Sequence, residues 1–418
     1  MIKIIKEKIR SFLIFTQRFT RTDNIYLAKG GFWIISAGIV ANILGIVMAI
    51  IFTRLSTKVV YGQYQFVLAL IDTLLILSLP AINTAVMEAV VRGKEKSVLL
   101  AIKRRLQFGL TGSLIFLLIG VYFYVFKQMF LMAGALLAVA IFFPAYNIVN
   151  TVFAYYDAKK KFYLPQIIHI LMRLIITASI VIAIIFWNNI FAIITIYLIA
   201  NGVMNLVILW YFKKTEKLNG EADLDIVHYG LQLTFANIIP EILNNADKLF
   251  ISVFLGVEAL AIYIIAEKIP NSIKGFLKSL KILFFPKFVY LSKENFIAKF
   301  KNVYPFFIFV SGTILIIIAL PWIIPLLFGS GYKDSIFIAQ LCSLIILPFI
   351  LYDIISDWFQ AKKDIKKYFY IRNFFVIGSA LLIVVFLFFY KSLISVIWAR
   401  IIITWLAFIY GLYWVKKS

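Results

Sequence analysis

The chain has 418 residues, of which 63% are hydrophobic and only 15% charged. A soluble globular domain holds about 45–50% apolar and about 25% charged residues, so this composition excludes a soluble protein. The formal net charge of +23 lies in short connectors between apolar runs, which argues against a nucleic-acid-binding domain. Because Cys342 is the single cysteine, an intramolecular disulfide and a cysteine-based metal cluster are also excluded.

The chain begins with a basic tail, residues 1–29, whose apolar stretch is interrupted by Lys and Arg, unlike a cleavable signal. Some of its apolar residues recur near one helical face: Ile2, Ile5, Ile9, Phe12 and Phe19. Two interpretations remain open: an amphipathic helix on the anionic inner leaflet, or a basic tail without regular structure.

Twelve apolar runs of about 20 residues follow, and each is long enough to cross a bilayer as an α-helix. They lack the period-two alternation of a transmembrane β-barrel. The predicted spans are 30–52, 64–88, 106–126, 129–154, 164–187, 190–212, 230–255, 258–281, 303–327, 335–360, 371–390 and 393–414. The expected fold class is therefore an all-α membrane protein with about 12 transmembrane helices.

Basic residues alternate in abundance from one connector to the next. The tail, Arg92–Arg105 and every second connector after them are rich in Lys and Arg. The intervening connectors carry few: Arg54, Lys58, Lys127, Lys333 and Lys391. By the positive-inside rule, this predicts a multi-pass protein of the inner (cytoplasmic) membrane with both termini in the cytoplasm.

The longest connector after the tail, 213–229, resembles a solvated cytoplasmic linker and divides the spans into two sets of six, 30–212 and 230–418. A faint repeat relates the two sets. Asn42–Tyr64 and Asn237–Tyr263 each run from an apolar helix through a short turn into the next span. This predicts two six-helix lobes with pseudo-two-fold symmetry and a site between them near the membrane midplane.

Three segments resemble a known family. Asn244 to Lys248, followed by LFISVFLGVEALAIYIIA, resembles the seventh-helix signature of Wzx-type lipid-linked oligosaccharide flippases. These polysaccharide exporters belong to the MOP superfamily, which also holds MATE drug exporters and lipid II flippases. Arg54 through Tyr64 resembles the matching turn of the first half, and Phe328 through Asp334 resembles the loop between helices nine and ten.

The resemblance implies a MATE-like fold and a flippase rather than an enzyme. Its substrate would be a polyprenyl-diphosphate-linked oligosaccharide, such as an O-antigen, capsule or exopolysaccharide repeat unit, moved from the inner to the outer leaflet by alternating access. The expected partners are this lipid, membrane lipids and other polysaccharide assembly proteins, with no nucleic acid. No cofactor or metal is expected beyond a coupling proton or Na⁺. Lipid II flippases carry basic residues in helix one, where this chain has Asn42 and Met48, so a dedicated lipid II role is not expected.

Ionisable residues inside spans are costly and usually face a protein interior or water, so they are the candidate site residues. The cations expected to bind a diphosphate are Arg173, Lys248, Lys268, Lys274 and Arg400. The acids expected to couple transport to protons or Na⁺, or to balance these cations, are Asp72, Glu241, Asp247, Glu267, Asp353 and Asp357. The pairs Asp247–Lys248 and Glu267–Lys268 could instead be structural ion pairs.

Two other functions remain open. A MATE-like multidrug or cation antiporter would share the fold, but its cavity should favour acidic residues over the basic ones seen here. A membrane-embedded glycosyltransferase or polymerase usually has a large external loop, whereas the longest predicted outer connectors are 53–63 and 328–334.

Overall fold

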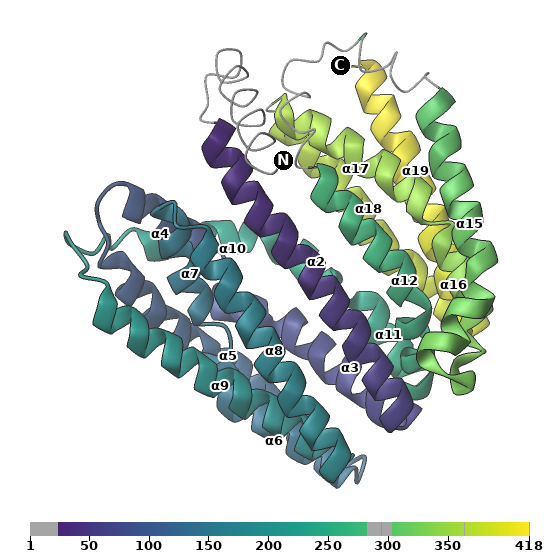
Figure 1. Ribbon diagram of the computed structural model, residues 1–418, viewed down its shortest axis with the longest axis horizontal. Coiled ribbons are helices and arrows are strands. Elements are labelled where there is room, and N and C mark those ends of the chain that lie inside the picture. Colours follow the sequence, from purple (N-terminus) through teal and green to yellow (C-terminus); the bar gives the residue numbers. More distant parts are fainter. Residues whose placement is uncertain (1–23, 282–293, 295–302, 363, 418) are drawn as a thin grey trace, which may run out of the picture.

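The computed structural model describes residues 24–281, 294, 303–362 and 364–417, and within these ranges every regular element is a helix (Figure 1). The first half comprises α2 (Asn24–Leu55), α3 (Lys58–Leu74), η1 (Leu75–Ser78), α4 (Ile82–Val91), α5 (Ser97–Val125), α6 (Phe130–Phe142), η2 (Phe143–Ala145), α7 (Val149–Ala158), α8 (Tyr163–Phe186) and α9 (Ile190–Thr215). The second half comprises α10 (Ile226–Leu243), α11 (Ala246–Phe254), α12 (Val257–Lys281), α15 (Val303–Phe328), η3 (Ser330–Tyr332), α16 (Ser335–Ser343), α17 (Ile346–Ala361), α18 (Ile365–Tyr390) and α19 (Leu393–Lys417). The all-α prediction is confirmed, and the predicted amphipathic helix near the N-terminus lies outside the described residues.

Ten helical segments of the described chain are long and apolar enough to cross a membrane. Two predicted spans are not among them. Span 230–255 is interrupted at Asn244 and Asn245, between α10 and α11. Span 258–281 coincides with α12, whose charged residues, including Glu267 and Lys268, lower its hydropathy. Both segments are nevertheless helical and pack against the other helices.

Two spans of the first half are broken near their middle. Between η1 and α4, Leu79 adopts a left-handed conformation (φ 56°) and is followed by Pro80. Between α6 and α7, the turn η2 contains Pro144. Such breaks remove backbone hydrogen bonds, and at membrane depth they are tolerated only where protein groups replace the lost partners.

The replacement at these breaks comes from Arg105 of α5. Its guanidinium donates to the carbonyls of Ser78 (3.2 Å) and Asn147 (2.9 Å) and to Oγ1 of Thr151 (3.2 Å). Arg105 is only 1% exposed. Its assignment to the connector 92–105 is therefore wrong: α5 begins at Ser97, so the last residues of that segment are helical and Arg105 lies inside the bundle.

The helices form two lobes that are joined at one end of the molecule and separate at the other. At the joined end, residues of both halves share one buried core, with Phe52 and Tyr61 of the first half and Tyr263 and Leu387 of the second. At the other end there are two separate cores. One is built on α4, α5, α7 and α9 with Ile226 of α10, and the other on α17, α18 and α19. In Figure 1 the two groups of helices diverge toward the end where α2 begins and α19 ends.

Close backbone packing and polar contacts tie the lobes together at the joined end. Gly62 of α3 lies so close to α12 that a Cβ atom added to it would be 1.8 Å from the carbonyl oxygen of Val257. Arg54 donates to the carbonyl of Leu326 (2.6 Å) at the end of α15. Because helix C-termini carry unsatisfied carbonyls and partial negative charge, this cation stabilises the contact between lobes.

The connector between the lobes is shorter than 213–229 and is docked on the first lobe. Its non-helical part is 216–225, because α9 continues to Thr215 and α10 begins at Ile226. The backbone N–H of Glu95 donates to the carbonyl of Asn219 (3.1 Å). In return, the backbone N–H of Asn219 donates to Oε2 of the Glu95 side chain (3.0 Å). Lys159 also pairs with Glu95, so this segment is hydrogen-bonded to the first lobe although most of its residues are exposed.

Candidate functional site

The broken helices of the first lobe surround a cavity of about 440 Å³, here called the N-lobe cavity. Residues of α2, α3, α7, α8 and α9 line it, and Lys268 of α12 contributes from the second lobe. Its polar lining residues are Tyr61, Tyr64, Gln65, Asp72, Tyr146, Asn147, Asn150, His169, Arg173, Thr177, Tyr197, Asn201, Asn205 and Lys268. A cavity of this size falls in the range of about 300–1,000 Å³ typical of ligand sites.

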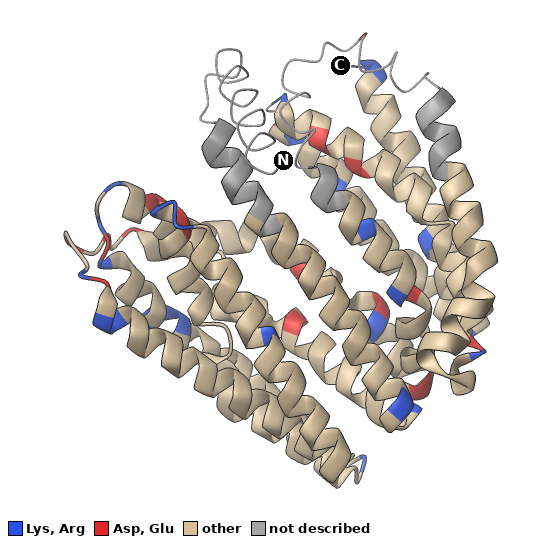
Figure 2. Ribbon diagram, in the orientation of Figure 1, with Lys and Arg blue, Asp and Glu red and all other residues tan. Residues whose placement is uncertain are grey.

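Cations from both lobes meet at this cavity. Arg173 of α8 and Lys268 of α12 both line it, and Lys268 interacts electrostatically with Arg173 and with Lys248 of α11. The ammonium of Lys268 lies against α2, where a Cβ added at Gly45 would be 3.2 Å from its Nζ. Figure 2 shows charged residues along helices on both sides of the space between the lobes, in addition to those at the helix ends.

One carboxylate faces these cations from the first lobe. Asp72 of α3 lines the N-lobe cavity and interacts electrostatically with Lys248 and Glu241 of the second lobe. Lys248 is held by a hydrogen bond from its Nζ to Oδ1 of Asn245 (2.8 Å), at the break between α10 and α11. The three basic residues Arg173, Lys248 and Lys268 outnumber the two acidic residues Asp72 and Glu241. The junction between the lobes therefore keeps an excess of positive charge.

A second cavity, of about 190 Å³, lies inside the second lobe and is here called the C-lobe cavity. Asp247, Lys274, Arg400 and Thr404 line it together with apolar residues of α17 and α18. Arg400 of α19 pairs with Asp247 (3.2 Å). This cavity therefore contains an ion pair between residues 153 positions apart in the chain.

Two more groups complete the ion pair at Arg400. Its guanidinium also contacts Glu267 and donates to the hydroxyl of Tyr263. That hydroxyl donates in turn to Oδ2 of Asp247 (2.6 Å). Glu267 is 4% exposed and Tyr263 is fully buried, while the side chains of Arg400 and Asp247 are 19% and 13% exposed where they line the cavity. A buried charge is tolerated only when it is paired and hydrogen-bonded in this way.

The structure thus places the predicted site residues in three groups. Arg173, Lys268 and Asp72 line the N-lobe cavity, with Lys248 and Glu241 within electrostatic range of it. Asp247, Glu267, Lys274 and Arg400 gather at or beside the C-lobe cavity. Asp353 and Asp357 of α17 are among the lining residues of neither cavity. The pairing of Glu267 is with Arg400 rather than with the adjacent Lys268.

The sequence analysis missed the uncharged polar residues of the N-lobe cavity. Tyr197, Asn201 and Asn205 follow one another at four-residue intervals on α9. Asn147 and Asn150 lie at the break before α7. An asparagine pair at helical spacing within an apolar span is a detectable signal, because residues four apart share one face of a helix.

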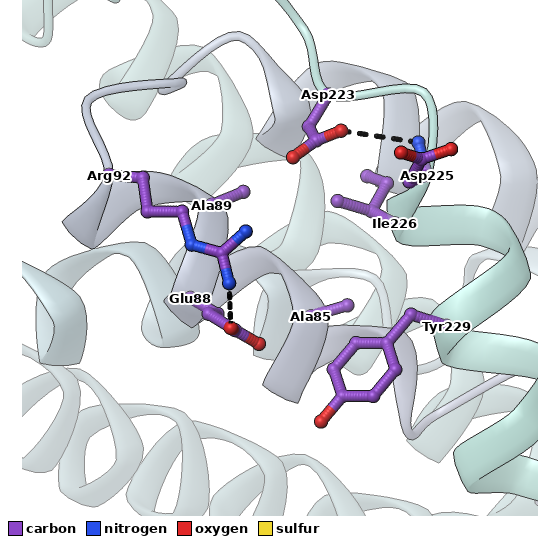
Figure 3. Close-up of a pocket in the computed structure, with 8 residues that line it drawn as sticks. All are labelled: Ala85, Glu88, Ala89, Arg92, Asp223, Asp225, Ile226 and Tyr229. Carbon is purple, nitrogen blue, oxygen red and sulfur yellow. Dashed lines mark hydrogen bonds and ion pairs between the residues drawn. The ribbon is translucent and has the colours of Figure 1, made fainter.

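A third hollow, of about 330 Å³, lies at the separated end between α4 and the start of α10 (Figure 3). Its charged lining residues are already engaged with their neighbours: Arg92 pairs with Glu88, and Asp223 accepts a hydrogen bond from the backbone N–H of Asp225 (3.3 Å). This hollow therefore lies where the connector between the lobes docks on α4. Within the described residues, no three His, Cys, Asp or Glu side chains gather as a metal site requires.

Comparison with solved structures places the chain on one known fold. A multidrug resistance MATE family transporter of the MOP superfamily, in an outward-facing conformation, matches with a TM-score of 0.58 at 15% identity over 94% of both chains. A MATE in complex with MaL6 matches with a TM-score of 0.63 at 15% identity, over 94% of this chain and 95% of that one. A MOP superfamily transporter from Pyrococcus furiosus, described as having a binding pocket of reverse polarity, matches with a TM-score of 0.60 at 12% identity, over 93% and 95% of the two chains.

Sequence comparison gives the family. Among curated proteins no sequence matches. A family model for polysaccharide biosynthesis proteins, however, matches residues 27–292, which is more than half of the chain and includes both helices that carry the junction cations Arg173 and Lys268. This match shows that the chain belongs to the polysaccharide biosynthesis protein family, and the solved structures show that its fold is MATE-like.

Proposed function

We propose that this membrane transporter moves a polyprenyl-diphosphate-linked oligosaccharide from the inner to the outer leaflet by alternating access. The observation that carries the proposal is the meeting of Arg173 from the first lobe with Lys248 and Lys268 from the second, beside a polar cavity. A diphosphate that enters hydrocarbon must be neutralised, and guanidinium and ammonium groups bind phosphate oxygens through charge-assisted hydrogen bonds.

The proposed conformation is open toward the cytoplasm. Basic connectors that the structure describes, at 92–97, 159–161, 213–217 and 364–367, lie at the end where the two cores are separate, and the positive-inside rule assigns them to the cytoplasm. The substrate's sugar head would enter between the lobes there, while its polyprenyl tail stays in the lipid. Release at the other leaflet requires the lobes to part where Gly62 now packs on α12.

Coupling to an ion gradient is proposed for the buried cluster at Arg400. Asp247 and Glu267 share Arg400, so a proton or Na⁺ that binds one of these two carboxylates would compete with Arg400 for it. The same cluster lies next to Lys248 through the adjacent Asp247, which connects it physically to the cations at the lobe junction.

The test is flipping in proteoliposomes that contain a polyprenyl-diphosphate-linked oligosaccharide, followed by an enzyme that reaches only the external sugar. We expect Arg173→Ala and Lys268→Ala each to slow flipping at least about tenfold, because each removes a charge-assisted contact of about 1.5–3 kcal/mol. Arg104→Ala is the matched control: Arg104 is exposed on α5 and contacts Gln107. Wild-type protein that moves cationic dyes and no lipid-linked sugar would replace this proposal with drug export.

A further inference from the structure

One wall of the N-lobe cavity is built from uncharged hydrogen-bonding residues. Tyr197, Asn201 and Asn205 lie on one face of α9, and Tyr146 and Asn147 come from the break before α7. These five residues are called the amide–tyrosine wall below. The hydroxyls of Tyr146 and Tyr197 are hydrogen-bonded to each other, and the backbone carbonyl of Asn147 is held by Arg105. The wall is therefore a braced surface rather than a set of mobile side chains.

The wall has hydrogen-bonding capacity that the described part of the protein leaves unused. Asn205 is 2% exposed, and its amide nitrogen donates to the carbonyls of Ala145 and Tyr146 and to Oδ1 of Asn201, each at 3.0 Å. Its own Oδ1 accepts no hydrogen bond within the described ranges. An unpaired buried acceptor costs free energy, and Asn205 is among the lining residues of the cavity, so a ligand donor that reaches this oxygen would gain a hydrogen bond.

The amide–tyrosine wall and the cations Arg173 and Lys268 line the same cavity. Arg173 interacts electrostatically with Tyr146 and Tyr197 on one side and with Lys268 on the other. In a polyprenyl-diphosphate-linked saccharide, the first sugar is bonded directly to the phosphate that is farther from the lipid. When Arg173 and Lys268 hold the diphosphate, this sugar lies within one sugar length of them, and the wall is an uncharged polar surface that lines the same cavity.

We infer that the amide–tyrosine wall is the subsite for the first sugar of the substrate, and that it takes an uncharged sugar. This inference rests on the proposed function. Amides and phenols both donate and accept, as sugar hydroxyls do, so each sugar hydroxyl can be matched in either direction. A carboxylated sugar is disfavoured, because Asp72 lines the same cavity and would repel its charge, while Arg173 and Lys268 are already paired with the diphosphate.

The test measures binding rather than transport, with protein in lipid nanodiscs. The probes are polyprenyl diphosphate without sugar and the same lipid carrying glucose, galactose, N-acetylglucosamine or glucuronic acid. For wild type we expect at least one neutral-sugar lipid to bind at least about tenfold more tightly than the bare lipid, and the glucuronic acid lipid to show no such gain. Asn201→Leu and the milder Tyr146→Phe should reduce the gain to within about twofold and leave affinity for the bare lipid unchanged.

Two variants separate this inference from the proposed function. Arg173→Ala should weaken binding of the bare and sugar-bearing lipids alike, because the diphosphate is common to both. Asn373→Leu, on α18, should change neither, because Asn373 is not among the lining residues of the cavity. The inference is overturned if wild type binds no neutral-sugar lipid more tightly than the bare lipid, or if Asn201→Leu and Tyr146→Phe keep the gain. Wild type that binds neither kind of lipid overturns the proposed function, and this subsite with it.

Discussion

Arg105 shows how one residue can hold a broken helix together inside a membrane protein. It is 1% exposed, and its described hydrogen bonds go to carbonyls, hydroxyls and an amide oxygen, including Ser78 O and Asn147 O. In hydrocarbon, carbonyls freed by a helix break have no water to bind, so the guanidinium supplies what the missing turn would have supplied. Because Arg105 binds the carbonyl of Asn147, it also holds in place a residue that lines the N-lobe cavity.

Arg105→Ala should therefore destabilise the protein by about 2 kcal/mol or more, because several buried acceptors would lose their donor at once. The measurement is thermal unfolding in detergent. Arg104→Ala, one residue earlier and exposed, is the matched control and should leave the unfolding midpoint unchanged. Equal midpoints for the two variants would contradict the bracing role of Arg105.

Arg400 differs from Arg105 because its partners are charged carboxylates. Arg400→Leu would leave the carboxylates of Asp247 and Glu267 buried without their cation, and breaking such a pair costs about 3–5 kcal/mol. The unfolding midpoint should fall accordingly. Adding Asp247→Asn and Glu267→Gln to the same chain should restore most of the loss, since neutral amides need no cation. A single variant as stable as wild type would show that this cluster is not charged in the folded protein.

At the scale of elements, the connector between the lobes is fastened by acids whose pKa values are shifted. Burial acts to raise the pKa of Glu95, but hydrogen bonds from Lys159 and from the backbone of Asn219 outweigh it and lower that pKa. The hydrogen bond from Lys94 likewise lowers the pKa of Asp223. A carboxyl with a lowered folded pKa adds stability at pH values above its unfolded pKa and loses it as pH falls through the folded pKa.

The docked connector should therefore be stable at neutral pH and detach in acid, below about pH 4, where unfolded Glu and Asp begin to protonate. Pepsin cleavage within 216–225, followed as pH is lowered, measures this. Cleavage should be slow near pH 5 and rise below about pH 4. Glu95→Gln should raise cleavage across this range, because a neutral side chain cannot pair with Lys159. A cleavage rate that is equal in both proteins would mean that Glu95 does not hold the connector.

At the scale of the whole molecule, the lobes have one core at one end and two at the other, which defines where they can part. The joined end depends on the absence of a side chain at Gly62, which packs against the carbonyl of Val257. The same end carries the polar ties between Arg54 and Leu326 and between Lys58 and Asp334 (3.5 Å). These ties are few and partly exposed, so the apolar packing contributes most to closure.

Gly62→Val should push the lobes apart at this end. We expect longer distances between spin labels at Val59 on α3 and Lys333 beside η3 than in the unsubstituted labelled protein. Gly312→Val on α15 is the matched control, because a Cβ there meets no atom within 4 Å. Unchanged label distances in Gly62→Val, with the protein folded, would locate the closure elsewhere.

The sequence alone was sufficient for the class of the fold, and it singled out the charged residues that line the two cavities. Hydropathy locates membrane helices because hydrocarbon thickness sets their length, and charge inside a span is costly enough to be noticed. That reasoning found Arg173, Lys268 and Arg400. It did not determine how the spans are broken at Leu79 and Asn244, since the form of a helix break depends on what replaces the lost hydrogen bonds.

What only the tertiary structure decided is the partner of each polar group. The sequence left open an ion pair between the neighbours Glu267 and Lys268. In the fold, Glu267 binds Arg400 of α19, while Lys268 lines the N-lobe cavity with Arg173. Residues adjacent in a helix point in directions about 100° apart, so neighbours in the chain face different surroundings. The sequence determined that this protein spans a membrane and carries charge within it. The packing of distant helices determined which charges meet, because those contacts join residues more than a hundred positions apart.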